Sequence, residues 1–116
     1  NPAAGRAIAA TLATLPKRET HIICGMLNTK DVKGFLAPIA AHCASLTTVT
    51  IPNEINAVAA ADLAEVGRSC AIASREARDV QTALQDLSQR HPRARILICG
   101  SLYLAGHVMR ENDPDA

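Results

Sequence analysis

The stretch Arg95–Gly100, RILICG, decides the fold, because it is a short and almost wholly apolar run of strand length that ends in glycine. Residues 21–26, HIICGM, form a second run of the same kind. Strands that are apolar on nearly every residue are typical of a parallel sheet buried on both faces. We therefore expect the rest of the chain to supply helices for both faces.

Helical and strand-like patterns alternate along the whole chain. The predicted helices cover residues 3–15, 31–43, 57–66, 75–89 and 101–110, and the predicted strands cover residues 21–26, 46–51, 69–73 and 95–100. We expect Pro38 to kink the second helix, Gly67 to end the third and Ser74 to cap the fourth. The order predicts an α/β, Rossmann-like domain with a mainly parallel sheet of about four or more strands and helices on both faces.

Length and composition limit the classes of function. The 116 residues predict a single domain over residues 1–116. Twelve Lys and Arg against eleven Asp and Glu leave a net charge of +1, and Phe35 and Tyr103 are the two aromatic residues. Neither nucleic acid nor a membrane is therefore expected as partner. We expect a soluble cytoplasmic protein, and the start at Asn1-Pro2 rather than at Met predicts a piece of a longer one.

Cysteines and histidines are scattered along the sequence. They are Cys24, Cys43, Cys70, Cys99, His21, His42, His91 and His107. Disulfide scaffolds and zinc sites have clustered spacings, so neither is predicted, and no metal ligands are assigned. The cysteines are expected to act as small buried apolar residues in a reducing cytosol.

The loop after the first predicted strand carries polar groups suited to an anionic ligand. Asn28, Thr29 and Lys30 follow Gly25 in this loop, and Asp31 opens the next helix. Ligands of open parallel sheets bind beyond the carboxyl ends of the strands, where a lone cation suits an anion. The structural alternative is an ordinary loop in which Thr29 or Asp31 is the N-cap.

A second junction follows the last predicted strand. Gly100-Ser101 would place a hydroxyl and free backbone N–H groups at a helix N-terminus, which suits a carboxylate or phosphate, and N-capping is again the alternative. Glu54 and His107 are weaker candidates, for which loop solvation and surface packing are sufficient explanations. Neither a G-x-G-x-x-G fingerprint nor a Walker A loop is present.

At these junctions the sequence resembles a known family. Residues 25–32, GMLNTKDV, resemble a G-[MVL]-x-x-[DT]-K-D loop, and residues 100–104, GSLYL, resemble a G-S-[LF]-[YF]-L junction. Asn1-Pro2 is similar to the end of a D-G-A-H-N-P linker. The chain thereby resembles the C-terminal domain of folylpolyglutamate synthase/dihydrofolate synthase, in the Mur ligase superfamily, a domain that the linker precedes.

The resemblance implies an ATP-dependent ligase. An N-terminal P-loop domain, absent from this chain, would bind ATP and Mg²⁺, and dihydropteroate or a reduced folate would be activated as an acyl phosphate. The amino group of L-glutamate would then attack to form an amide. A monomer is implied, in which this domain closes over the cleft beside its own N-terminal domain.

The resemblance also implies roles for particular residues. Asn28, Thr29, Lys30, Ser101 and Leu102 would bind glutamate, and Asn1 would lie near ATP. No catalytic residue is assigned within this fragment, which is expected to be inert alone.

Some features depart from the family pattern. Asn28-Thr29 stands where many members have an acidic residue before the lysine.

Two alternatives to a folate ligase domain are the C-terminal domain of a peptidoglycan Mur ligase and a non-catalytic Rossmann-like binding module. A magnesium-binding receiver domain would need clustered acidic residues at its strand ends, where this chain supplies only Asp31. Dihydrofolate synthesis, polyglutamate extension and a combination of the two all remain open.

Overall fold

The computed structural model describes residues 2–101, whose four parallel strands form one sheet in the order β3-β2-β1-β4. The strands are β1 (Thr20–Gly25), β2 (Ser45–Thr48), β3 (Ser74–Glu76) and β4 (Arg95–Gly100). The helices are α1 (Pro2–Thr14), α2 (Val32–Leu36), the 3₁₀ helix η1 (Ala37–His42), α3 (Ala60–Ser69) and α4 (Val80–Arg90). The predicted last helix and the acidic tail at 111–116 lie outside the described residues, apart from Ser101.

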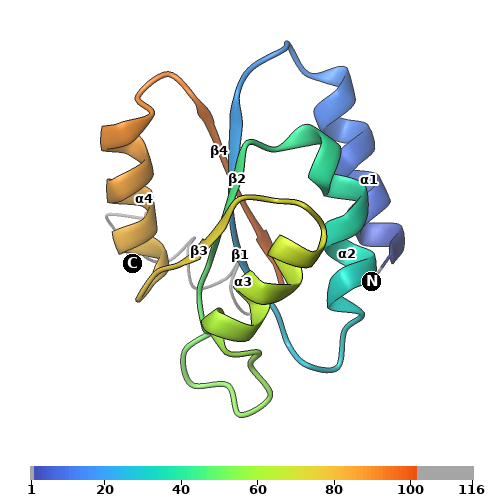
Figure 1. The fold of residues 1–116 in the computed structure, drawn as a ribbon, viewed down its shortest axis with the longest axis vertical. Coiled ribbons are helices and arrows are strands. Elements are labelled where there is room, and N and C mark those ends of the chain that lie inside the picture. The colour runs from blue at the N-terminus through green and yellow to red at the C-terminus, as the bar shows by residue number, and fades with distance from the viewer. Residues whose placement is uncertain (1, 102–116) are drawn as a thin grey trace, which may run out of the picture.

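Helices cover both faces of the sheet, as the apolar strands predict (Figure 1). On one face, Ile22 and Cys24 of β1 lie in a core formed with residues of α2, η1 and α3, against which α1 also packs. On the other face, Ile23 packs in a second core with Val80 and Leu87 of α4. Alternation of side chains along β1 divides its apolar residues between the two cores, and this confirms the predicted α/β fold.

The prediction of a strand at residues 69–73 is wrong. Ser69 ends α3, and the N–H of Cys70 donates to the carbonyl groups of Val66 and Gly67. Ala71 then turns the chain with a positive φ of 63°. The edge strand β3 lies just beyond, at Ser74–Glu76, and its polar residues form no apolar run that would predict a strand.

The helix predicted at residues 75–89 begins five residues later than predicted. Ser74 belongs to β3 and its hydroxyl donates to the carbonyl of Ile72, so it caps no helix. The helix α4 begins at Val80, where Asp79 is the N-cap and accepts a hydrogen bond from the Thr82 N–H at 2.7 Å.

The third helix also begins and ends later than predicted. Ala57 bridges to Leu27, and the Val58 N–H donates to the carbonyl of Met26, so these residues belong to a loop. Gly67 does not end α3 but lies within it, where it packs closely against Ser74 and Leu46 of the adjacent strands. Close helix–sheet packing, rather than termination, is the role of this glycine.

The segment predicted as one helix at residues 31–43 is divided. Asp31 is the N-cap of α2 and accepts a hydrogen bond from the Gly34 N–H at 2.9 Å. At Pro38 the chain continues as the 3₁₀ helix η1, since proline cannot supply the N–H of an α-helical turn. The predicted kink therefore takes the form of a change of helix type. The strand predicted at 46–51 is also shorter than expected, ending at Thr48.

The cysteines, which were expected to be small buried residues, are free thiols in the structure. Cys24 is buried, whereas the other three are only half-buried. Among the helices of residues 2–101, none is long and apolar enough to cross a membrane.

The Asp79 cap should make stability depend on pH. The Thr82 N–H holds the pKa of Asp79 below its usual value, helped by the Thr82 hydroxyl and Arg78. A lowered folded-state pKa stabilises the fold above the unfolded-state pKa, near 4, and this contribution is lost as the pH falls through the folded-state pKa. Asp79→Asn keeps a capping oxygen without a charge. In urea unfolding at about pH 5 and about pH 3, the wild type should therefore lose more stability than Asp79→Asn. Equal losses would contradict this origin.

Candidate functional site

The two sequence junctions meet at the carboxyl ends of neighbouring strands. β1 pairs with β4 in register from Thr20↔Arg95 to Gly25↔Gly100, and the Ser101 N–H then donates to the Gly25 carbonyl at 3.1 Å. Gly100 has a φ of 132°, and a Cβ at this position would overlap the Gly25 carbonyl oxygen. Glycine is thus required at position 100 by the close approach that brings Ser101 to the end of β1.

Ser101 is a buried polar residue at this edge. The residue is 7% exposed, and within residues 2–101 its hydroxyl has no hydrogen-bond partner. Buried hydroxyl groups are nearly always satisfied, and leaving one unpaired is costly. An anion or polar ligand that accepted from this hydroxyl would remove that cost.

The loop after β1 presents the other predicted residues to solvent. Asn28, Thr29 and Lys30 are exposed in a turn closed by the Lys30 N–H, which donates to the Leu27 carbonyl at 3.2 Å. Lys30 forms no ion pair with any other described residue. Of the two N-cap alternatives, the structure selects Asp31, so capping of α2 does not occupy the Thr29 side chain.

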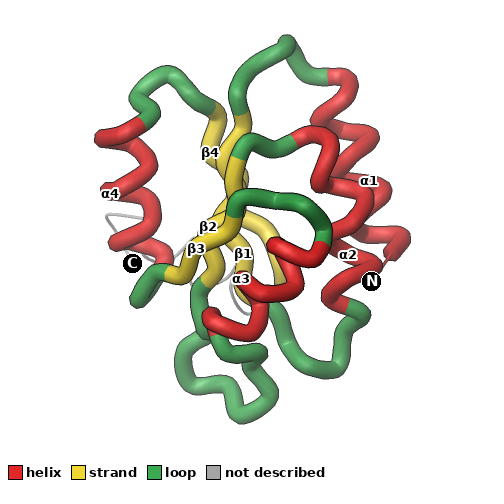
Figure 2. The backbone as a smooth tube through the Cα atoms, viewed as in Figure 1, coloured by secondary structure: helices red, strands yellow, loops and turns green. Residues whose placement is uncertain are grey.

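A loop from β2 supports this turn, and sequence analysis did not identify that role. The Asn28 N–H donates to the Asn56 carbonyl at 2.7 Å, and Leu27 bridges to Ala57. Both loops gather at the lower end of the sheet in Figure 2. Ile55 is 96% exposed in the supporting loop. The turn signal Pro52-Asn53 marked this loop, but only the parallel register of β1 and β2 brings it to the same edge.

The structure therefore brings Lys30, Thr29 and Ser101 to one edge of the sheet, but these residues do not bond to one another. Among the described residues, no hydrogen bond links Lys30 or Thr29 to Ser101. Glu54 lies in the supporting loop at the same edge. The predicted residues Asn1 and Leu102, and the weaker candidate His107, lie outside the described residues.

Two of the cysteines, the buried Cys24 and the half-buried Cys43, are poor nucleophiles. Cys24 faces Cys99 across β1 and β4, and their hydrogen bond together with burial raises the pKa of Cys24 well above its usual range. Burial, with a smaller contribution from Cys99, raises the pKa of Cys43 to about 11. Because the thiolate is the reactive form, these thiols suit packing rather than catalysis.

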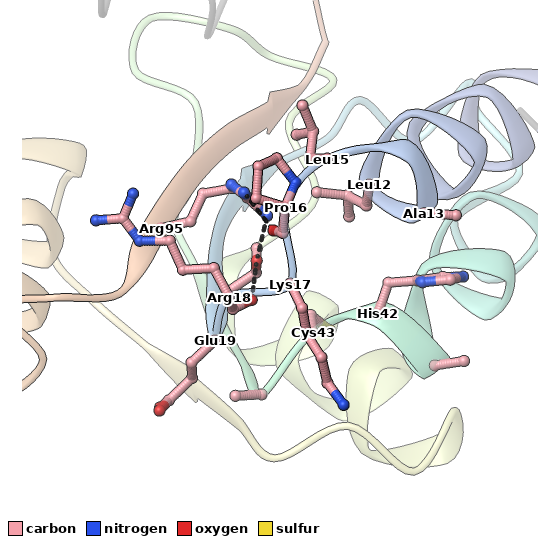
Figure 3. A pocket seen from close by; sticks show the side chains of 13 residues that line it. Leu12, Ala13, Leu15, Pro16, Lys17, Arg18, Glu19, His42, Cys43 and Arg95 are labelled. Atoms are coloured by element: carbon pink, nitrogen blue, oxygen red, sulfur yellow. Dashed lines mark hydrogen bonds between the residues drawn. The ribbon is translucent and has the colours of Figure 1, made fainter.

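A cavity of about 460 Å³ lies at the opposite, amino end of the sheet. Figure 3 shows Arg18 and Arg95 on one side of this cavity and His42 on the other. The Arg95 guanidinium donates to the Pro16 carbonyl at 3.0 Å and to the Thr20 hydroxyl at 3.3 Å, and Arg18 donates to the Arg93 carbonyl. These cations hold the ends of the strands in place and do not converge on one ligand, so the carboxyl edge remains the candidate site.

Comparisons with known structures agree with this fold. The chain matches E. coli FolC in complex with DHPP and ADP, with a TM-score of 0.82 and 24% identity, over 96% of this chain and 26% of that one. A bifunctional folylpolyglutamate synthase/dihydrofolate synthase from Yersinia pestis, complexed with AMPPNP and Mn, gives 0.82 and 27% over the same shares. A bifunctional synthase with Mn, AMPPNP and L-glutamate bound gives 0.79 and 25%, again over 96% and 26%. At 24% identity, the similarity to E. coli FolC supports the fold and nothing further.

The chain spans about a quarter of the length of these solved relatives. Among curated proteins there is no significant match. Residues 1–111 match the model of the dihydrofolate synthetase C-terminal domain, which is nearly the whole sequence. The chain therefore belongs to the family of dihydrofolate synthetase C-terminal domains, a part of the folylpolyglutamate synthase/dihydrofolate synthase group.

Proposed function

We propose that this chain is the glutamate-binding part of an ATP-dependent ligase that joins L-glutamate to dihydropteroate or a reduced folate. One observation carries the proposal: the exposed Lys30 and the buried Ser101 hydroxyl, which has no partner among residues 2–101, follow adjacent strands that end at the same edge of the sheet. Further support is that a relative of the same fold was solved with L-glutamate bound.

The chemistry of glutamate fits the groups at this edge. Its two carboxylates need cationic and hydrogen-bonding partners, while its amino group must stay free to attack. Lys30 would pair with one carboxylate through its ammonium group, and Ser101 would donate a hydrogen bond from its hydroxyl. Asn28 and Thr29 add polar side chains in the same turn, and Leu102 continues the junction after Ser101.

ATP would supply the phosphoryl group that activates the acceptor carboxylate. Because the sequence contains no phosphate-binding loop, we assign ATP and Mg²⁺ to the rest of the polypeptide, with Asn1 at most at the margin of that site. Domain closure would then bring the glutamate held by this domain to the activated acceptor. We propose that the ligase acts as a cytoplasmic monomer and that residues 1–116 alone are inactive.

The proposal is tested by ADP release from the intact polypeptide. With ATP and Mg²⁺ present, release should require both L-glutamate and a pteroyl acceptor, and the preferred acceptor identifies the reaction. Dependence on a muramyl acceptor instead would favour a Mur ligase. Release that is independent of glutamate with every acceptor would contradict the proposal. The isolated chain serves as the control and should release no ADP.

Within the active polypeptide, Ser101→Ala isolates the contribution of one hydroxyl. Loss of a hydrogen bond to a charged group costs about 1.5–3 kcal/mol, so the KM for glutamate should rise about 10- to 100-fold. The KM for ATP should change little. Unchanged glutamate kinetics would remove Ser101 from the site and leave the ligase assignment in place.

A further inference from the structure

Three potential metal ligands that are distant in sequence meet at the amino end of β1. Glu19 precedes β1, His21 belongs to β1, and His91 is the C-cap of α4. The Glu19 Oε1 atom lies 2.7 Å from His21 Nε2 and 3.7 Å from His91 Nδ1. All three atoms lie within 4.8 Å of one another, so both ring nitrogens face the same carboxylate oxygen.

These separations are close to those of a small divalent metal site. Zinc lies about 2.0–2.2 Å from nitrogen and oxygen ligands, so in tetrahedral geometry the ligand atoms are roughly 3.3–3.6 Å apart. The two distances from Glu19 lie on either side of that range. The buried His21 is fixed within β1, whereas the side chains of Glu19 and His91 are 55% and 30% exposed and have room to adjust.

The surroundings of His21 favour its use as a ligand. Its second nitrogen, Nδ1, lies 2.6 Å from the Ser45 hydroxyl of β2. Histidines that bind metals commonly donate their other N–H to an oxygen, which fixes the ring and leaves the first nitrogen free to coordinate. The His91 ring stacks on His21, with centroids 4.0 Å apart and an angle of 20° between the rings. Because histidine binds a metal ion in the plane of its ring, binding of one ion by both rings requires the His91 ring to rotate out of this stack. The His91 side chain is 30% exposed and has room for that rotation.

The cluster is also open to solvent. A cavity of about 360 Å³ is lined by Glu19 and His91 together with the chain from Pro92 to Ala94. An ion could enter from this side, and a water molecule could complete a fourth coordination position.

We propose that Glu19, His21 and His91 form a binding site for one divalent transition-metal ion of the Zn²⁺ type. Nitrogen and carboxylate donors of this kind suit Zn²⁺ and Co²⁺. The ion would link the start of β1 to the turn after α4, and its binding would raise the free energy of unfolding. The site lies at the end of the sheet opposite Lys30 and Ser101, and it is independent of the proposed ligase activity.

The test is calorimetric titration of the chelator-treated 116-residue chain with Zn²⁺. We expect one ion per chain, with affinity lowered at least about tenfold by both Glu19→Gln and His91→Ala. His42→Ala is the matched control, because His42 is an exposed histidine outside the cluster, and it should bind as the wild type does. Glu19→Gln keeps the shape of the side chain and provides a result if His91→Ala does not fold.

Titration with Co²⁺ separates this site from the free cysteines. The absorption spectrum should show a low-coordinate ion with nitrogen and oxygen ligands and no sulfur-to-cobalt charge-transfer band. A charge-transfer band that survives in both variants, an affinity unchanged in both, or no stoichiometric binding would each overturn the proposal.

Discussion

Gly100→Ala should lower the free energy of unfolding by about 2–4 kcal/mol. A φ of 132° is strained for any residue with a side chain, which costs about 1–3 kcal/mol. The added methyl group would also overlap the Gly25 carbonyl oxygen. To relieve that overlap, the ends of β1 and β4 must move apart, which weakens the hydrogen bond from the Ser101 N–H to the Gly25 carbonyl. The weakened bond costs about 1 kcal/mol more. Urea unfolding of the isolated chain measures the difference.

Ser101→Ala is the control for this stability measurement. It changes the next residue in the chain, whose backbone does not have a positive φ. Within the described residues the buried Ser101 hydroxyl has no partner, so its removal should not lower the free energy of unfolding and should raise it by up to about 1–3 kcal/mol. If Gly100→Ala also failed to lower the free energy of unfolding, the strand ends would adapt easily. The close approach of the two junctions would then not depend on glycine.

Lys30→Ala in the intact polypeptide should raise the KM for glutamate about 10- to 100-fold. This prediction rests on the proposed function: Lys30 is an exposed cation at the end of β1 with no ion pair among residues 2–101. A hydrogen bond to a charged carboxylate contributes about 1.5–3 kcal/mol, which corresponds to that change. The KM for ATP should remain near the wild-type value, as measured by ADP release at varied glutamate and ATP.

Lys33→Ala is the matched control for Lys30→Ala. Lys33 is also an exposed lysine, one turn further along in α2, so its removal changes the net charge equally without altering the strand-end loop. Glutamate kinetics should be unaffected by it. An equal effect of the two variants would indicate a general electrostatic attraction of glutamate. A normal glutamate KM in Lys30→Ala would exclude this lysine and leave the ligase reaction to be judged on its own test.

Apolar strands were predictable because their pattern is local. The bounds of β4 were predicted correctly, and those of β1 within one residue, since buried parallel strands are apolar along their length. The edge strand β3 was misplaced because SRE has no apolar pattern. Its position follows from pairing with β2, as in Leu46↔Ser74, which is a tertiary contact.

The sequence predicted which residues belong to the candidate site, but not their burial or their hydrogen bonds. The polar turn at 28–30 and the hydroxyl at Ser101 could be identified from the sequence, and topology explains why they belong to one edge. Strand register determines the burial of Ser101, the hydrogen bond from its N–H to Gly25 and the hydrogen bond from the Asn28 N–H to Asn56. A local sequence pattern does not specify strand register.

The sequence by itself determined the α/β class, the parallel sheet and the family, because periodicity and short motifs are properties of neighbouring residues. Only the tertiary structure decided which distant groups meet. It placed Gly25 against Gly100 through the β1–β4 register, and it brought Glu19, His21 and His91 together although 70 residues separate the two histidines. Such contacts arise from chain crossovers, which set distances that spacing along the sequence does not encode.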